Sequence, residues 1–288
     1  MVFDARQWSR CGSKFNTLSN ILKYGLTSLQ SKMAEFLGDP RFPEKAMRTN
    51  SRALKIEYFQ ELYKLYSRLS FSRYEDRPFA IAGLEKRLRR AFDTRGGYGV
   101  FDDGNKPERG LFHRSILWQS DEKNGLELIE FPAERNIYVP TWSWMAYKGA
   151  IDYVDIPGGS ADWETNDIEE PWTRGQNRGS SSAPQDGIIG ISVVVRDYTV
   201  IKHRKGEIGL TYDLPDRTRG SDGQRAQCVV VAKSTQARKE SGKRYYVLLV
   251  APTQITSGGK KIYHRLGAGY LAGKHVDMDA PGVKAELQ

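Results

Sequence analysis

Residues 139–145 read Val-Pro-Thr-Trp-Ser-Trp-Met and place two tryptophans, Trp142 and Trp144, two positions apart. Side chains two residues apart in an extended segment lie on the same face, so this pair would bury a large apolar area together. The physical default is therefore a pair of core anchors, with Trp118 as a third member of the same cluster. The alternative is an exposed aromatic pair that stacks on a base or a sugar.

Short β-branched or aromatic runs surround this motif and alternate with Gly, Pro, Asn and Asp, which is typical of a sheet with many turns. We predict a strand-rich part over residues 96–275, interrupted by a mobile loop rich in Gly and Ser over 173–187. Residues 276–288 are expected to form a tail. The predicted strands cover residues 115–119, 126–131, 188–202, 209–212, 227–232, 245–250 and 262–266.

The preceding part of the chain has the periodicity of helices. Apolar residues recur at three- and four-residue intervals over 54–69 and predict a helix over 51–68. A second helix with a strongly basic polar face is expected after Pro78, which gives a helical part over 51–95 behind an irregular segment over 1–50. The predicted fold class is α+β, a mainly helical N-terminal third packed on a mostly antiparallel β-sheet or sandwich.

The positive charge of the chain is concentrated in its helical third. The 288 residues carry a formal charge of +9, yet residues 93–288 hold 26 Lys and Arg and 26 Asp and Glu, while residues 1–92 hold 18 against nine. A surplus of this kind favours an acidic partner, and the candidate interaction residues are Arg87, Arg89 and Arg90 on the second helix.

The location of the chain follows from what its sequence lacks. The longest apolar run is far below the roughly 20 residues that a membrane helix needs, so no membrane partner is expected. The two cysteines have no CxxC neighbour, and the first residues lack the pattern of a secretory signal. The expected compartment is the cytoplasm.

Residue types that usually carry catalysis are scattered. No histidine has a His or Cys partner at metal-site spacing, and Cys228 in a Cys-Val-Val-Val run is expected to be a buried, inert thiol. The glycine-rich stretch over 95–99 lacks the features of a nucleotide-binding loop and is predicted to be a turn between helix and strand. We therefore expect no enzymatic activity, cofactor or metal, although a closed polar pocket around His113 or His264 would reopen the question.

Four ordered blocks resemble the region that follows the HET domain in fungal heterokaryon-incompatibility (HET) proteins. Residues 59–71 are similar to the family's helix and turn with YS.R.LTF, although Phe59 stands where tryptophan is usual. Residues 76–84 resemble DRLPAIAGL, residues 110–118 resemble LHRSLLW, and residues 140–147 resemble PSWSWMAY. Beyond these four blocks, residues 263–267 look like the end of the family's terminal strands, Y.R.G.G. The signature positions, which the resemblance implies to be structural, are Tyr66, Ser67, Asp76, Arg77, Gly83, His113, Arg114, Trp118, Pro140, Trp142, Ser143, Trp144, Arg265 and Gly267.

The resemblance implies a non-enzymatic regulatory or scaffold region of a protein for fungal self/non-self recognition, heterokaryon incompatibility and programmed cell death. The HET domain that carries the death signal in this family has no counterpart in the sequence, so we expect a truncated family member. The implied partner is a HET domain, in the same chain in full-length relatives or in another chain, or a different protein. The alternative is a basic nucleic-acid-binding module, although residues 84–92 lack an aromatic residue on their polar side.

Alanine substitution of the paired tryptophans tests their assignment as core anchors. If both rings are buried, Trp142→Ala and Trp144→Ala each destabilise the protein by roughly 3–5 kcal/mol, because each removes apolar burial and leaves a cavity. Thermal denaturation measures this loss. Melting midpoints close to wild type for both variants would contradict the assignment.

Overall fold

The computed structural model divides the chain into two units, Met1–Tyr58 and Phe59–Gln288. The first unit is described only over its last residues, which begin helix α4, and the second contains all the contacts discussed below. The predicted irregular segment over 1–50 and the predicted mobile loop over 173–187 lie outside the described residues. The structure describes residues 52–102, 110–121, 125–135, 137–172, 190–200, 204–215, 226–236, 242–257 and 259–288.

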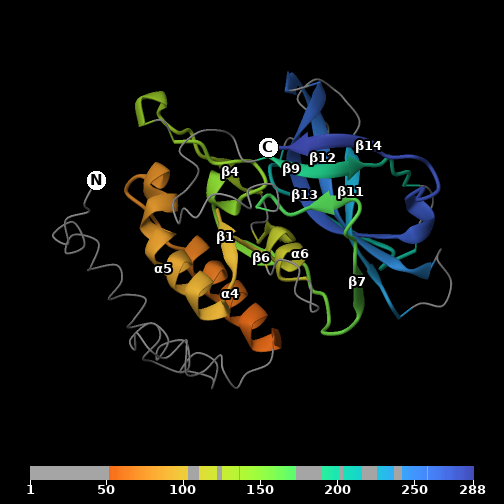
Figure 1. The fold of residues 1–288 in the computed structure, drawn as a ribbon, viewed down its shortest axis with the longest axis horizontal. Helices are drawn as coiled ribbons and strands as arrows, with labels where there is room; N and C mark the ends of the chain where they lie inside the picture. The colour runs from red at the N-terminus through yellow and green to blue at the C-terminus, as the bar shows by residue number, and fades with distance from the viewer. Residues whose placement is uncertain are drawn as a thin grey trace. The chain divides into compact units, whose positions relative to one another are not determined.

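Three α-helices in the described ranges precede the large sheet in sequence: α4 (Arg52–Ser67), α5 (Arg77–Phe92) and α6 (Leu111–Ile116) (Figure 1). Helices α4 and α5 confirm the two predicted helices. Pro78 lies in the first turn of α5, where its missing N–H breaks no helical hydrogen bond. The strand predicted over 115–119 is wrong at its start, because α6 continues to Ile116 and the strand β3 begins only at Trp118.

The largest sheet has eight strands in the order β7, β11, β12, β13, β14, β9 and β8, with β10 also paired to β13. Among the described residues, neighbouring strands of this sheet pair antiparallel, except β13 and β14, which are parallel. Helices together with mostly antiparallel sheets confirm the α+β class. The strands are β7 (Ala161–Trp163), β8 (Ile168–Glu169), β9 (Ile191–Val195), β10 (Ile208–Tyr212), β11 (Gln227–Ser234), β12 (Arg244–Ser257), β13 (Lys260–Ala272) and β14 (Val283–Leu287).

The large sheet curls until two strands that are distant in its order meet. Arg196, which follows β9, bridges Cys228 of β11 through backbone N–O distances of 2.8 and 2.9 Å. Side chains alternate between the two faces, as the period of a strand requires. Val229 and Leu248, which are paired across β11 and β12, belong to one core cluster, whereas Cys228 and its partner Leu249 belong to the other.

Within residues 276–288, expected to form a tail, Val283–Leu287 instead form the strand β14 of this sheet. After the short helix η7 (Gly273–His275), the chain enters β14 between β13 and β9. Ala285 and Leu287 are buried in the first core cluster, and the backbone N–H of Gln288 donates to the carbonyl of Tyr263 at 3.0 Å. The alternation of Val-Lys-Ala-Glu-Leu is a strand pattern, and burial of its apolar side explains why this segment is ordered.

Short elements connect the helices α4 and α5 to the sheet, and we call them the middle layer. Their neighbouring residues point in opposite directions: Val100 joins the core of the large sheet, whereas the ring of Phe101 packs on Phe59 and Tyr63 of α4. The middle layer comprises β1 (Arg95–Gly97), β2 (Val100–Asp102), β3 (Trp118–Ser120), β4 (Glu127–Leu128), β5 (Tyr147–Lys148), β6 (Ile151–Tyr153) and the 3-10 helices η2 (Tyr74–Asp76), η3 (Ala133–Arg135) and η4 (Trp144–Ala146).

The tryptophan motif also points in two directions. Both rings are fully buried, which confirms that they are core anchors. The expected common face is wrong, because Ser143 caps η4 and the chain turns between the two rings. Trp142 packs in the core of the large sheet, whereas Trp144 packs against Tyr63 of α4 with ring centroids 5.1 Å apart. The motif therefore joins the two sides of the middle layer.

Gly267 in β13 has no side chain, which allows the backbone of β10 to lie directly against this position. A Cβ atom on Gly267 would stand 2.2 Å from the carbonyl oxygen of Thr211, a backbone atom that cannot easily move. We expect Gly267→Ala to destabilise the protein by roughly 1–3 kcal/mol through overpacking, measured by chemical denaturation. Gly158→Ala is the control, since a Cβ there meets no atom within 4 Å. Equal stability of the two variants would refute this role for Gly267.

Candidate functional site

Many of the signature residues converge on two buried arginines, of which Arg265 in β13 is the first. Its Nε donates to Asp213 at 2.8 Å, and both side chains are almost fully buried, at 0% and 1% exposure. One Nη donates to the carbonyl of Ile116 at 2.7 Å, and the other donates to the carbonyl of Trp118. The guanidinium also lies 3.4 Å from the centre of the Trp118 ring. One side chain thus ties β13 to the ends of β10 and α6 and to β3.

The Arg265–Asp213 pair is matched in charge and hydrogen bonding within the interior. Burial raises the pKa of the Asp213 carboxyl above its ordinary value, while the adjacent Arg265 guanidinium acts in the opposite direction. Replacing both members of such a pair by apolar residues changes the stability of a protein little. Removing only one member destabilises it, because the other charge is left buried without compensation. The arrangement therefore fixes the relative positions of β13 and the end of β10.

Arg77, in the first turn of α5, is the second buried arginine. Its guanidinium donates to three backbone carbonyls, those of Ser67 (2.7 Å), Gly149 (3.2 Å) and Tyr147, and lies 5.0 Å from the centre of the Trp144 ring. Burial lowers the pKa of Arg77 to about 10. Backbone carbonyls hold this cation, so Arg77 joins α5 to the end of α4 and to the loop after η4.

Other signature side chains are also bonded to the backbone. The hydroxyl of Tyr66 donates to the carbonyl of Arg77 at 3.2 Å, and Nε1 of Trp118 donates to that of Trp142 at 2.8 Å. Ser143 Oγ donates to the carbonyl of Tyr98 at 2.7 Å. His113 Nε2 lies 2.7 Å from the carbonyl oxygen of Glu164, Arg114 donates to that of Ile156 at 2.6 Å, and Pro140 is buried. These hydrogen bonds join the signature residues to the backbone of neighbouring segments, and we call the set a framework.

Two signature residues lie outside this framework. Asp76 forms an ion pair with Arg135 at 2.6 Å, with its side chain about half exposed, and Gly83 is exposed on α5. Gly83 belongs to a stripe of exposed residues spaced three or four positions apart, which we call the outer face of α5. This face comprises Phe79, Ala82, Gly83, Lys86 and Arg90.

The three arginines predicted to bind a partner do not share one surface. Arg90 is exposed on the outer face, Arg87 is only partly exposed, and Arg89 lies near Glu85 and Tyr63 with a buried Nε. Successive helical residues are about 100° apart, so positions 87, 89 and 90 cannot all point the same way. The helix instead presents Phe79, 51% exposed, on the same side as Lys86 and Arg90.

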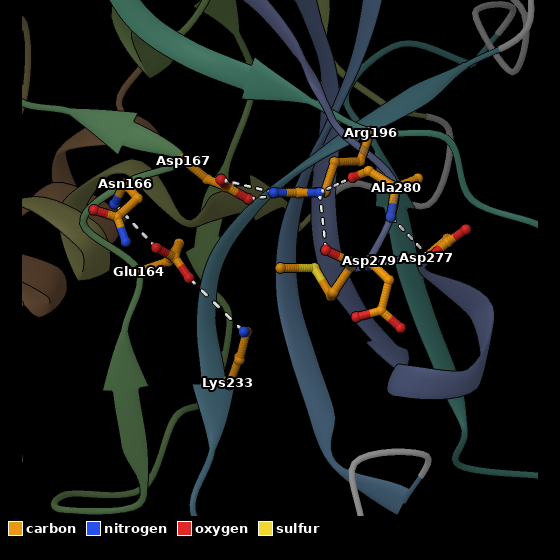
Figure 2. Close-up of polar contacts among 9 residues, drawn as sticks. Glu164, Asn166, Asp167, Arg196, Lys233, Asp277, Asp279 and Ala280 are labelled. Atoms are coloured by element: carbon orange, nitrogen blue, oxygen red, sulfur yellow. Dashed lines mark hydrogen bonds and ion pairs between the residues drawn. The ribbon is translucent and has the colours of Figure 1, made fainter.

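Sequence patterns did not reveal a polar cluster around Arg196 (Figure 2). Arg196 forms a two-point ion pair with Asp167, at 2.7 and 3.0 Å, and donates to the carbonyl of Ala280 at 2.7 Å. Lys233 and Glu164 form a longer ion pair nearby, at 3.8 Å. Arg196 thereby holds the segment that leads into β14. Asp167 and Arg196 are 29 residues apart, and no local spacing pairs them.

The surroundings of Cys228 agree with the expectation of a buried, inert thiol. Cys228 is fully buried, and burial raises its pKa to about 12. His264 is nearly buried in β13. Within the described ranges, no three His, Cys, Asp or Glu residues are grouped as metal ligands. No helix in those ranges has the length and apolarity to cross a membrane.

No protein-family model, curated protein or solved structure matches this sequence. The resemblance to HET proteins therefore depends on the four sequence blocks themselves.

A double-mutant cycle tests whether Arg265 and Asp213 act as one unit. Arg265→Met leaves the Asp213 carboxyl buried beside apolar groups and should cost about 3–5 kcal/mol of unfolding free energy. Adding Asp213→Asn to this variant should recover part of the loss, because it removes the uncompensated charge. Chemical denaturation of the four proteins gives the coupling energy, and additive losses would show that the residues act independently.

Proposed function

We propose that this chain is a non-enzymatic regulatory or scaffold region of a HET-type protein for fungal self/non-self recognition, acting in the cytoplasm. It would bind a HET domain, in the same chain or in another, and restrain the death signal until a cue arrives. The sequence blocks suggest the family. The single structural observation that supports a scaffold role is that the signature side chains of these blocks are bonded mainly to buried backbone carbonyls.

The outer face of α5 is the surface that we assign to the partner. The same helix carries Arg77 on its buried side, so the framework fixes the direction in which the outer face points. The face combines an exposed aromatic ring, small residues that permit close approach, and the cations Lys86 and Arg90. This chemistry fits an acidic protein surface with an apolar centre.

Binding to a purified HET domain tests the proposal. We expect a complex whose affinity falls as salt is added, because opposite charges meet across the interface. Phe79→Ala with Lys86→Glu should weaken binding at least tenfold in calorimetry, with an unchanged melting midpoint. Lys205→Glu, which reverses an exposed charge in the turn before β10, is the matched control and should bind like wild type. Undetectable binding by wild type, or equal binding by the Phe79 and Lys86 variant, would refute the proposal.

The restraint can be tested in cells. If this region holds a HET domain inactive, the HET domain expressed alone should be more toxic than the same domain with this region attached. An isolated domain that is no more toxic than the joined form would contradict the restraint, although binding could still occur.

The second candidate, a nucleic-acid-binding module, is favoured by one observation. Phe79 supplies an exposed aromatic ring seven and eleven residues before Lys86 and Arg90, on the same side of α5. An aromatic residue among cations is what single-stranded nucleic acid requires. Binding of single-stranded RNA or DNA that weakens steeply with salt would favour this function over a protein partner.

A further inference from the structure

The turn between β1 and β2 is held by groups from several elements. Tyr98 and Gly99 both have positive φ, 55° and 78°, as the two central residues of a tight hairpin turn. The carbonyl of Tyr98 accepts from Ser143 Oγ, and its ring packs on Trp142. Gly99 lies so close to Trp144 that a Cβ there would stand 2.1 Å from the indole nitrogen. The turn therefore packs against both tryptophans of the motif, Trp142 and Trp144.

Glu85 supplies the remaining contact, from α5. Its carboxylate accepts the backbone N–H of Gly99 at 2.8 Å. The titratable groups that face Glu85 are Arg89 on the same helix, Tyr63 on α4 and Tyr98 in the turn. Neither tyrosine supplies a positive charge, so Arg89 is the one cation in this set.

Hydrogen bonds to the carboxylate are few for an ionised group. Among the described residues, the Tyr63 hydroxyl, Trp144 Nε1 and Arg89 Nε are buried and have no hydrogen-bond partner, so none of the three donates to Glu85. Burial raises the pKa of Glu85 to about 7, and the Gly99 N–H and the Arg89 charge oppose this only in part. The carboxyl therefore changes charge near neutrality while it is fastened to the turn.

We propose that Glu85 is a proton-controlled latch on the Tyr98–Gly99 turn, closed when the carboxyl is protonated and loosened when it is ionised. The sign follows from the raised pKa. Protonated Glu85 suits its enclosed position, so its contribution to stability is complete below the ordinary glutamate pKa and is lost as pH rises toward about 7. Only part of the Glu85 side chain reaches the surface. In the proposed open state the ionised carboxylate moves to water and gives up its hydrogen bond from the Gly99 N–H. Opening would also weaken the packing of the turn against Trp142 and Trp144. This effect does not depend on which partner the chain binds.

Amide hydrogen exchange of Gly99, followed by NMR in the full chain, tests the latch. After correction for the intrinsic pH dependence of exchange, its protection in wild type should be at least tenfold lower at pH 8 than at pH 5.5. Glu85→Gln keeps an acceptor of the same shape but has no charge, so its protection should be the same at both values. Glu130→Gln, which removes an exposed carboxylate between β4 and η3, should behave like wild type.

Equal protection of Gly99 at both pH values in wild type, or the same loss in Glu85→Gln, would overturn the proposal. A measurement on wild type alone covers the case in which Glu85→Gln does not fold. Carbon-13 NMR of the Glu85 carboxyl should show a titration midpoint near 7 that coincides with the loss of Gly99 protection. A midpoint in the ordinary glutamate range would exclude the latch.

Discussion

Of the two buried arginines, Arg265 and the groups that surround it are the contact on which the packing of the other elements depends. Its guanidinium is paired with Asp213, stacked on Trp118 and bonded to two backbone carbonyls, with no exposure of the side chain. A charge in the interior is tolerated only when every polar contact is made, so these elements can pack in few other ways. The backbone N–H of Arg265 also donates to Thr141, which positions the chain directly before Trp142.

The middle layer connects the contacts of Arg265 to the helices α4 and α5. Trp142 lies in the core of the large sheet and Trp144 lies against α4 and Arg77, so one short turn links the two buried arginines. Glu85 and the Tyr98–Gly99 turn sit at the same junction. The proposed latch would therefore act on the region that joins α4 and α5 to the large sheet.

Local patterns predicted the parts of this structure that depend on local physics. Apolar spacing located α4 and α5, and the runs that became β10, β11 and β12 were recognised as strands. The direction of Trp144 was missed because a capped turn replaces an extended segment, and β14 was missed because its apolar side is only three residues, Val283, Ala285 and Leu287. The pairs Arg265–Asp213 and Arg196–Asp167 join residues 52 and 29 positions apart, so no periodicity could reveal them. The family resemblance marked Arg77 and Arg265 as signature positions, but their contacts could be assigned only from the structure.

The most direct test of the buried framework is hydrogen exchange of the tryptophan side chains, followed by NMR on the native protein. The indole N–H of Trp118 donates to the carbonyl of Trp142 beneath Arg265, so it should exchange only when the whole protein unfolds. The partly exposed Trp163 serves as the internal reference and should exchange much faster. Exchange of Trp118 at the rate of Trp163 would contradict the claim that Arg265 and its contacts hold the fold together.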